Sequence, residues 1–243
     1  MASGNSCEAV FSSASAVTHY PMTKPSNDNL LKKGSSKVDM CVCHQNIHSV
    51  KNKVEELEIF LKMENVHVMC LTETWLRANE LEFLKISQYN VVTSYCRQTI
   101  ACGGVLILQK NNIFSSEIRE LRMLSVDQVF ECCGIMLVNP TCKIIVVCVY
   151  RTPDPSNLNL FFEKLEHCLI LIHRKSVNKV IICGDLNINL LIDNNAKTRL
   201  FESYLMQPAF KEITRLCSGT AIDYIITNFN DTIINSEVSH NGF

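Results

Sequence analysis

Two apolar runs of this chain end abruptly in acidic side chains. The run VIICGDLNINLL, residues 180–191, presents Asp185 and Asn187 after its apolar part, and VHVMCLTETW, residues 66–75, presents Glu73 in the same way. The carboxyl ends of strands are where α/β folds place their ligands. Two acids at two strand ends predict either a cation site built from oxygen ligands or a general acid/base site.

Three more polar residues stand at or just beyond apolar runs: Asn46, Tyr150 and Asp223. Each candidate also has a purely structural interpretation. An acid or amide at such a position can cap a helix or close a turn, which applies to Glu73, Asn46, Asp185 and Asn187. A tyrosine there is often an aromatic at the edge of the core, and Asp223 can be a residue at the edge of a strand ladder. Only the joint occurrence of these residues favours a functional site.

Composition limits what such a site could serve. The chain has 243 residues and 47% hydrophobic content, which fits one sandwich-sized domain with a buried core. Its 23 basic and 24 acidic residues nearly cancel, so no global basic field indicates nucleic-acid binding. Any contact with DNA must therefore be local.

The thirteen cysteines favour a reduced, intracellular protein. They are scattered, odd in number and often set inside apolar strands, which is typical of buried thiols. The closest spacings, Cys41 with Cys43 and Cys132 with Cys133, do not form the paired CxxC pattern of a zinc site. Core cysteines are the favoured interpretation.

The first residues lack a basic stretch and a sustained apolar run, so we do not expect a secretory leader, and no window reaches the length of a membrane span. Residues 1–37 are rich in Ser, Asn, Lys and Pro and follow neither the helical nor the strand period. We expect them to be a flexible extension that precedes a single domain at 38–243.

Within that domain, strand-like and helix-like patterns alternate. Helices are expected at 49–64, at 156–174 with Ser156 as N-cap, and at 197–205, with a polar helix-like stretch at 79–87. Strands are expected at 38–47, 66–73, 89–95, 103–110, 126–138, 142–150, 180–185, 221–228 and 232–238. Connections between residues 103 and 150 are too short for helical crossovers, so much of the sheet must be antiparallel. The pattern predicts an α/β sandwich with a two-sheet core and helices outside.

In order and wording, six passages resemble the endonuclease/exonuclease/phosphatase superfamily, and most of all the endonuclease domain of non-LTR retrotransposons. They are QNIHSVKNKVEELEIFL, VMCLTETWL, GGVLIL, VVCVYRTPDPS, VIICGDLNINLL and GTAIDYIITN, and the resemblance covers roughly residues 38–240. It implies a DNase I-like, four-layer α/β sandwich with two mixed, largely antiparallel sheets flanked by helices. It further implies a DNA-nicking phosphodiesterase that depends on Mg²⁺, with Mn²⁺ as a possible substitute.

The resemblance also assigns roles to the residues. Glu73 matches the glutamate that binds the metal, and Asp185 matches the aspartate that orients or deprotonates the attacking water. Asn187 matches the asparagine that hydrogen-bonds the phosphoryl oxygens. Asn46 matches an asparagine that orders the site, Tyr150 a tyrosine whose hydroxyl touches the phosphate, and Asp223 an aspartate that orients a catalytic histidine.

The sequence departs from the family pattern at two places. The Ser-Asp-His motif expected downstream of Asp223 is absent, and His240, in the sequence VSHNGF, is a poor substitute for its histidine. His48 stands where some family members carry a further acid. We therefore expect a domain that lacks its last motif and strand, with impaired activity and no reverse transcriptase domain, acting in the nucleus if it acts on DNA. The alternative is a catalytically inactive remnant or binding scaffold with the same fold, and a phosphatase or lipid phosphodiesterase is disfavoured.

Overall fold

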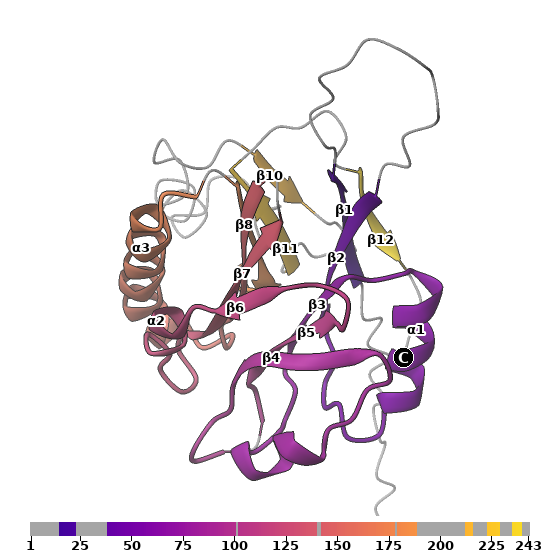
Figure 1. Ribbon diagram of the computed structural model, residues 1–243. Coiled ribbons are helices and arrows are strands. Elements are labelled where there is room, and N and C mark those ends of the chain that lie inside the picture. The colour runs from indigo at the N-terminus through magenta and orange to yellow at the C-terminus, as the bar shows by residue number, and fades with distance from the viewer. Residues whose placement is uncertain are drawn as a thin grey trace, which may run out of the picture.

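The computed structural model of the chain describes residues 15–22, 38–100, 102–139, 142–177, 179–188, 212–215, 223–228 and 235–239. These residues form two six-stranded sheets. The first has the order β12-β1-β2-β3-β5-β4 and the second β10-β11-β9-β8-β7-β6. Figure 1 shows the two sheets side by side, with helices on their outer sides.

The strands of the first sheet are β1 (Ser15–Met22), β2 (Val38–Asn46), β3 (Val68–Thr72), β4 (Tyr89–Tyr95), β5 (Val105–Lys110) and β12 (Asn235–Ser239). Those of the second are β6 (Ser115–Glu117), β7 (Glu131–Asn139), β8 (Cys142–Tyr150), β9 (Lys179–Asp185), β10 (Glu212–Arg215) and β11 (Asp223–Thr227). The helices are α1 (Val54–Met63), α2 (Arg119–Arg122) and α3 (Leu158–Arg174), with 3₁₀ turns η1 (Ala78–Phe83) and η2 (Pro155–Asn157). No described helix is long and apolar enough to cross a membrane.

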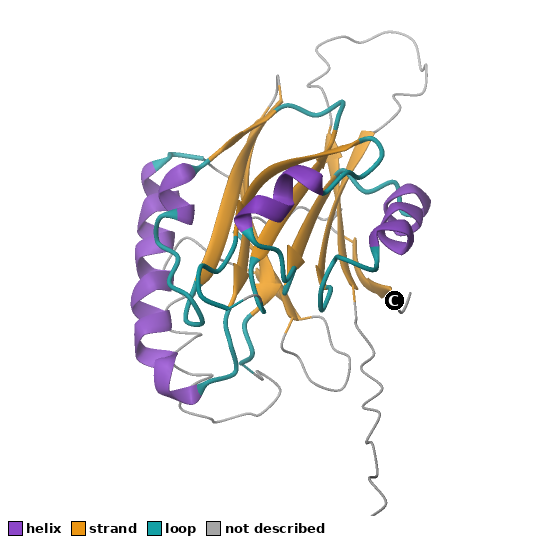
Figure 2. Ribbon diagram, turned by 90° about the horizontal axis from the view of Figure 1, so that it is seen from below, coloured by secondary structure: helices purple, strands orange, loops and turns teal. Residues whose placement is uncertain are grey.

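The layers are α1, the first sheet, the second sheet and α3 (Figure 2). Helix α1 buries Leu57, Phe60 and Leu61, a helical i, i+3, i+4 spacing, against the outer face of the first sheet. Helix α3 packs Phe161 and Leu165 in the same way on the second sheet. A third apolar cluster fills the space between the sheets. The predicted four-layer α/β sandwich is therefore confirmed.

Only two described strand pairs are parallel, β2 with β3 and β8 with β9, and the other described pairs are antiparallel. Each parallel pair is joined by a helix, α1 in the first case and α3 in the second. We call β2-α1-β3 the first βαβ unit and β8-α3-β9 the second. Because the strands of each unit run parallel, their carboxyl ends meet at one edge of the sheet. In register, Asn46 lies beside Thr72 and Tyr150 beside Asp185.

Two expectations from the sequence are wrong. Residues 15–22 belong to the fold, because β1 pairs antiparallel with both β2 and β12. Such a strand is stabilised by cross-strand partners distant in sequence, which its own local pattern does not reveal. Ser156 is not the N-cap: the Asp154 carboxylate accepts the Ser156 backbone N–H at 2.8 Å and begins η2, one turn before α3. The helix expected at 197–205 lies outside the described residues.

Candidate active site

Four side chains from the two βαβ units meet where their strands end. The Asn46 amide, at the end of β2, donates to Glu73 Oε1 at 3.1 Å and to Asp185 Oδ2 at 2.8 Å. The Tyr150 hydroxyl, at the end of β8, donates to the same Glu73 Oε1 at 2.8 Å. Residues up to 139 positions apart in sequence thus form one hydrogen-bonded group, which we call the polar cluster.

Glu73 lies one residue beyond β3 with left-handed backbone geometry, φ 52°. Its second oxygen, Oε2, accepts from Trp75 Nε1 at 3.3 Å and lies 3.2 Å from His48 Nδ1. The Glu73 side chain is 14% exposed, so one edge of it reaches solvent. Donors on both oxygens fix the carboxylate, and the N-cap residue of the following turn η1 is Arg77 rather than Glu73.

Asp185 ends β9 and is only 2% exposed. Burial raises the pKa of its carboxyl to about 6, although hydrogen bonds from Asn46 and from the Asn187 N–H act in the opposite direction. Burial, followed by the nearby Glu73 carboxylate, also raises the pKa of the Tyr150 hydroxyl. The tyrosine is therefore a neutral donor, whereas Asp185 can gain or lose a proton near neutral pH.

Asn187 shapes the loop after β9 more than the polar cluster itself. Its backbone N–H donates to Asp185 Oδ1 at 3.0 Å, with φ 50°, and its side-chain amide donates to the Arg151 carbonyl at 2.6 Å. Arg151, 2% exposed, returns bonds to the Leu186 and Asn187 carbonyls at 2.8 and 3.0 Å. These hydrogen bonds agree with the interpretation of Asn187 as a residue that forms a turn. The Arg151 carbonyl accepts one of the two hydrogens of the Asn187 side-chain amide.

For the remaining candidates from the sequence, the structure describes only part of each residue or none of it. The backbone of Asp223 lies directly opposite Asp185 in the β9–β11 ladder, so it belongs to the same edge of the sheet. Its side chain and His240 lie outside what the structure describes. Asn46 also accepts the His48 backbone N–H at 3.3 Å, a local turn in addition to its contacts across the sandwich.

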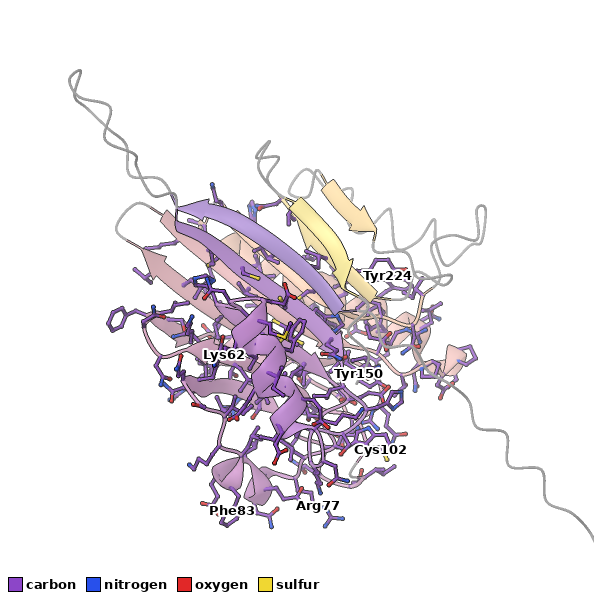
Figure 3. The ribbon with its side chains drawn as sticks, turned by 90° about the vertical axis from the view of Figure 1, so that its right-hand side faces the viewer. Lys62, Arg77, Phe83, Cys102, Tyr150 and Tyr224 are labelled. Atoms are coloured by element: carbon purple, nitrogen blue, oxygen red, sulfur yellow. The ribbon has the colours of Figure 1, made fainter. Side chains whose placement is uncertain are left out.

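Two residues near the polar cluster, Trp75 and Arg151, were not identified from the sequence, and His48 was noted there only as a departure from the family pattern. The His48 and Trp75 rings are 5.7 Å apart in an edge-to-face arrangement beside Glu73 Oε2. For Trp75, the signal in the sequence was its position two residues after Glu73, and for His48 it was its position two residues after Asn46. Figure 3 shows Tyr150 well apart from Arg77 and Phe83, which lie at the η1 turn.

The donor set fits a hard divalent cation. Among the described residues no group of three or more His, Cys, Asp or Glu side chains could hold a metal ion. Magnesium, however, commonly binds through one or two carboxylates and completes its coordination with water and phosphate oxygens. The partly exposed Glu73 carboxylate, beside the Asn46 amide, offers oxygen atoms of the kind that such a cation prefers.

Comparisons with known proteins agree with this architecture. No protein-family model and no curated protein matches the sequence. Among solved structures, the endonuclease domain of TRAS1, a telomere-specific non-LTR retrotransposon, superposes with a TM-score of 0.58 at 14% identity, covering 76% of this chain and 82% of that one. The catalytic domain of Xenopus laevis APE2 gives 0.56 at 20% identity over 75% and 80%. The Neisseria 3′ phosphatase NExo, bound to a product DNA hairpin, gives 0.52 at 13% identity over 75% and 84%. As its sequence resemblance predicted, the chain has the fold of the endonuclease/exonuclease/phosphatase proteins.

Proposed function

We propose that this chain is a divalent-metal-dependent phosphodiesterase that nicks DNA. The observation that carries the proposal is the polar cluster, in which Glu73 and Asp185 are joined through the Asn46 amide at the carboxyl edge of both sheets. The solved structures with this fold include an endonuclease domain and a phosphatase bound to DNA, which supports a phosphate ester as substrate.

Bound Mg²⁺, or Mn²⁺ in its place, would supply Lewis-acid stabilisation of the charge that develops on phosphate oxygens. Glu73 would hold the cation, with Asn46 fixing the orientation of the carboxylate. Tyr150 keeps Glu73 in place through its hydrogen bond to Oε1 and, as a neutral donor, can offer its hydroxyl to a phosphate oxygen. These roles use side chains whose relative positions are already fixed before substrate binds.

Asp185 is the candidate general base. With a pKa of about 6 it is deprotonated at neutral pH and still basic enough to take a proton from an attacking water. Water would attack phosphorus in line, the bond from phosphorus to O3′ would break, and a proton would pass to that oxygen to leave a 3′-hydroxyl. Asn187 would donate to a phosphoryl oxygen with the amide hydrogen that the Arg151 carbonyl does not take, and Asp223 would support the same edge.

A nicking assay on supercoiled plasmid tests the proposal. We expect conversion to the open circle with Mg²⁺ or Mn²⁺ but not with EDTA, and a loss of about 10²-fold or more in the Asp185→Ala variant. Glu117→Gln, which alters an ion pair of β6 with Arg122, is the matched control and should nick like the wild type.

Nicking that survives Asp185→Ala would contradict the assignment of the base. A wild-type chain that folds but nicks no DNA with either metal would contradict the proposed activity and favour a catalytically silent scaffold.

A further inference from the structure

A buried ion pair lies behind the polar cluster, between the two sheets. Arg97 follows β4 of the first sheet and Glu131 begins β7 of the second, and Arg97 Nε lies 2.5 Å from Glu131 Oε1. The side chains are 6% and 0% exposed. Taking two charges out of water costs about as much as the pair returns, so such a pair adds little net stability over apolar side chains. Stability alone therefore does not account for this pair.

One set of contacts runs from the pair to the backbone around Glu73. Glu131 Oε2 accepts the Gly104 N–H at 2.6 Å, and a Cβ added at Gly103 would overlap the Arg97 guanidinium. The Gly103 carbonyl in turn accepts the Trp75 N–H at 2.9 Å, and the Gly104 carbonyl accepts the Thr74 N–H at 3.4 Å.

These contacts hold a strained segment. Glu73 and Trp75 both have left-handed backbone geometry, with φ 52° and 55°. For a residue with a side chain this conformation is unfavourable, and it persists only when the surroundings impose it. The two glycine carbonyls impose it here, and the ion pair fixes the glycines.

A second set of contacts reaches Glu73 through Tyr150. The Arg97 guanidinium lies 5.9 Å from the centre of the Tyr150 ring, in the range of a cation–π contact. Glu131 is the register partner of Tyr150 in the β7–β8 ladder. Because the Tyr150 hydroxyl donates to Glu73 Oε1, the pair acts on the same carboxylate from a second direction.

Arg97 Nη2 is buried and has no hydrogen-bond partner among the described residues. Leaving a buried donor unpaired destabilises the folded protein, because the desolvation of that group is not compensated. A side chain selected for stability alone would avoid that cost, whereas one that must face both Gly103 and the Tyr150 ring has few other orientations.

We propose that Arg97 and Glu131 are positioning residues, which together hold the Glu73 carboxylate and the Tyr150 hydroxyl in the geometry that binds the metal and the phosphate. The metal-binding part of this inference depends on the proposed function. The positioning part does not, because it concerns the geometry of Glu73 without any metal.

Trp75 provides a readout of that geometry. It is the single tryptophan of the chain, and its indole N–H donates to Glu73 Oε2 at 3.3 Å. Its fluorescence in the metal-free protein therefore reports the position of the Glu73 carboxylate. Glu73→Gln defines the emission expected when that contact is altered.

The test uses Glu131→Gln, Arg97→Lys and the double variant Arg97→Met/Glu131→Gln, with Glu117→Gln as control. The double variant removes both charges, so it leaves no unpaired charge to unfold the protein. We expect each folded variant of the pair to shift the metal-free Trp75 emission toward that of Glu73→Gln, with Arg97→Lys smallest because it keeps the charge. We also expect Glu131→Gln and the double variant to need about 10-fold more Mn²⁺ for half-maximal nicking, with a smaller change in kcat.

A folded double variant with wild-type Trp75 emission and wild-type Mn²⁺ dependence would overturn the inference. If the wild type does not nick DNA at all, the proposed function fails, and the emission comparison still decides whether the pair positions Glu73.

Discussion

The two βαβ units supply the same kinds of side chain to the polar cluster but place their acids differently. Each contributes one acid and one neutral donor: Glu73 and Asn46 from the first unit, Asp185 and Tyr150 from the second. Asp185 is the last residue of its strand and is 2% exposed, whereas Glu73 lies one residue past its strand and its side chain is 14% exposed. Glu73 thus stands one position further beyond its strand than Asp185 does. The Glu73 carboxylate is partly exposed to solvent, whereas the Asp185 carboxylate is buried and has a raised pKa.

The layer directly beneath the polar cluster is uncharged in both units. Two residues before Asn46, Tyr150 and Asp185, on the same strand faces, lie His44, Cys148 and Cys183, all buried. Burial lowers the pKa of His44 to about 3 and raises the pKa of the Cys148 thiol to about 12. Charge is therefore confined to the strand ends, with a neutral layer below it.

The largest expected change in folding stability concerns His44 in the first βαβ unit. Its folded-state pKa of about 3 lies below the ordinary histidine pKa of 6.5, so the unfolded chain binds the extra proton first as pH falls. The stability that the neutral form contributes is complete above pH 6.5 and is lost on acidification, by roughly 4 kcal/mol at pH 3.5. His44→Gln, which stays neutral and can still bond Thr72, should lose correspondingly less stability on acidification.

Urea unfolding between pH 7 and pH 3.5 measures this difference. His173→Gln, at an exposed histidine of α3, is the control and should follow the wild type. Parallel curves for His44→Gln and the wild type would show that His44 does not set the acid sensitivity.

The next largest expected change in folding stability concerns Gly184 in the second βαβ unit. A Cβ added there would overlap the backbone carbonyl of Val149 on the adjacent parallel strand, which cannot move without breaking the ladder. Gly184→Ala should therefore lower the free energy of unfolding by about 3 kcal/mol or more. Gly134→Ala on β7 is the control, because the atom nearest to its Cβ would be the end of the Leu121 side chain, and the nearest backbone atom, the Val146 carbonyl oxygen, would lie at 3.4 Å. Equal losses in denaturant unfolding would contradict this account of how β8 and β9 pack.

The same comparison shows what the sequence could predict. Apolar runs that end in Asp185, Asn187 and Glu73 predicted the strand ends correctly, because strand periodicity and helix amphipathicity are local signals. The Arg97–Glu131 pair could not be predicted in this way, since its residues are 34 positions apart and belong to no recognisable motif. Strand β1 was missed for the same reason, because its partners lie elsewhere in the chain.

The sequence pattern also could not predict the individual contacts within the polar cluster and around it. The amide contact of Asn187 with the Arg151 carbonyl and the contact of His48 with Glu73 depend on backbone conformations with positive φ at Asn187, His48 and Glu73. Such conformations are determined by tertiary contacts rather than by residue type.

The smallest predicted change in stability concerns Asp185, and its sign is opposite to that of His44. The folded-state pKa of about 6 exceeds the ordinary aspartate pKa of 3.8, so the folded chain binds more protons between these values. The corresponding stability is present below pH 3.8 and is lost as pH rises through 6, by roughly 2 to 3 kcal/mol. Asp185→Asn should thus gain stability relative to the wild type between pH 4 and pH 7, as measured by urea unfolding. A relative stability independent of pH would refute the raised pKa.

The difference between the two acids is tested most directly by titrating the protein with Mn²⁺ in a calorimeter, because we propose the partly exposed Glu73, and not the buried Asp185, as the carboxylate that holds the cation. We predict one site per wild-type chain, abolished by Glu73→Gln and retained by Glu117→Gln. Wild-type protein that binds no Mn²⁺, or Glu73→Gln that binds it as the wild type does, would contradict the assignment of the polar cluster as a metal-dependent active site.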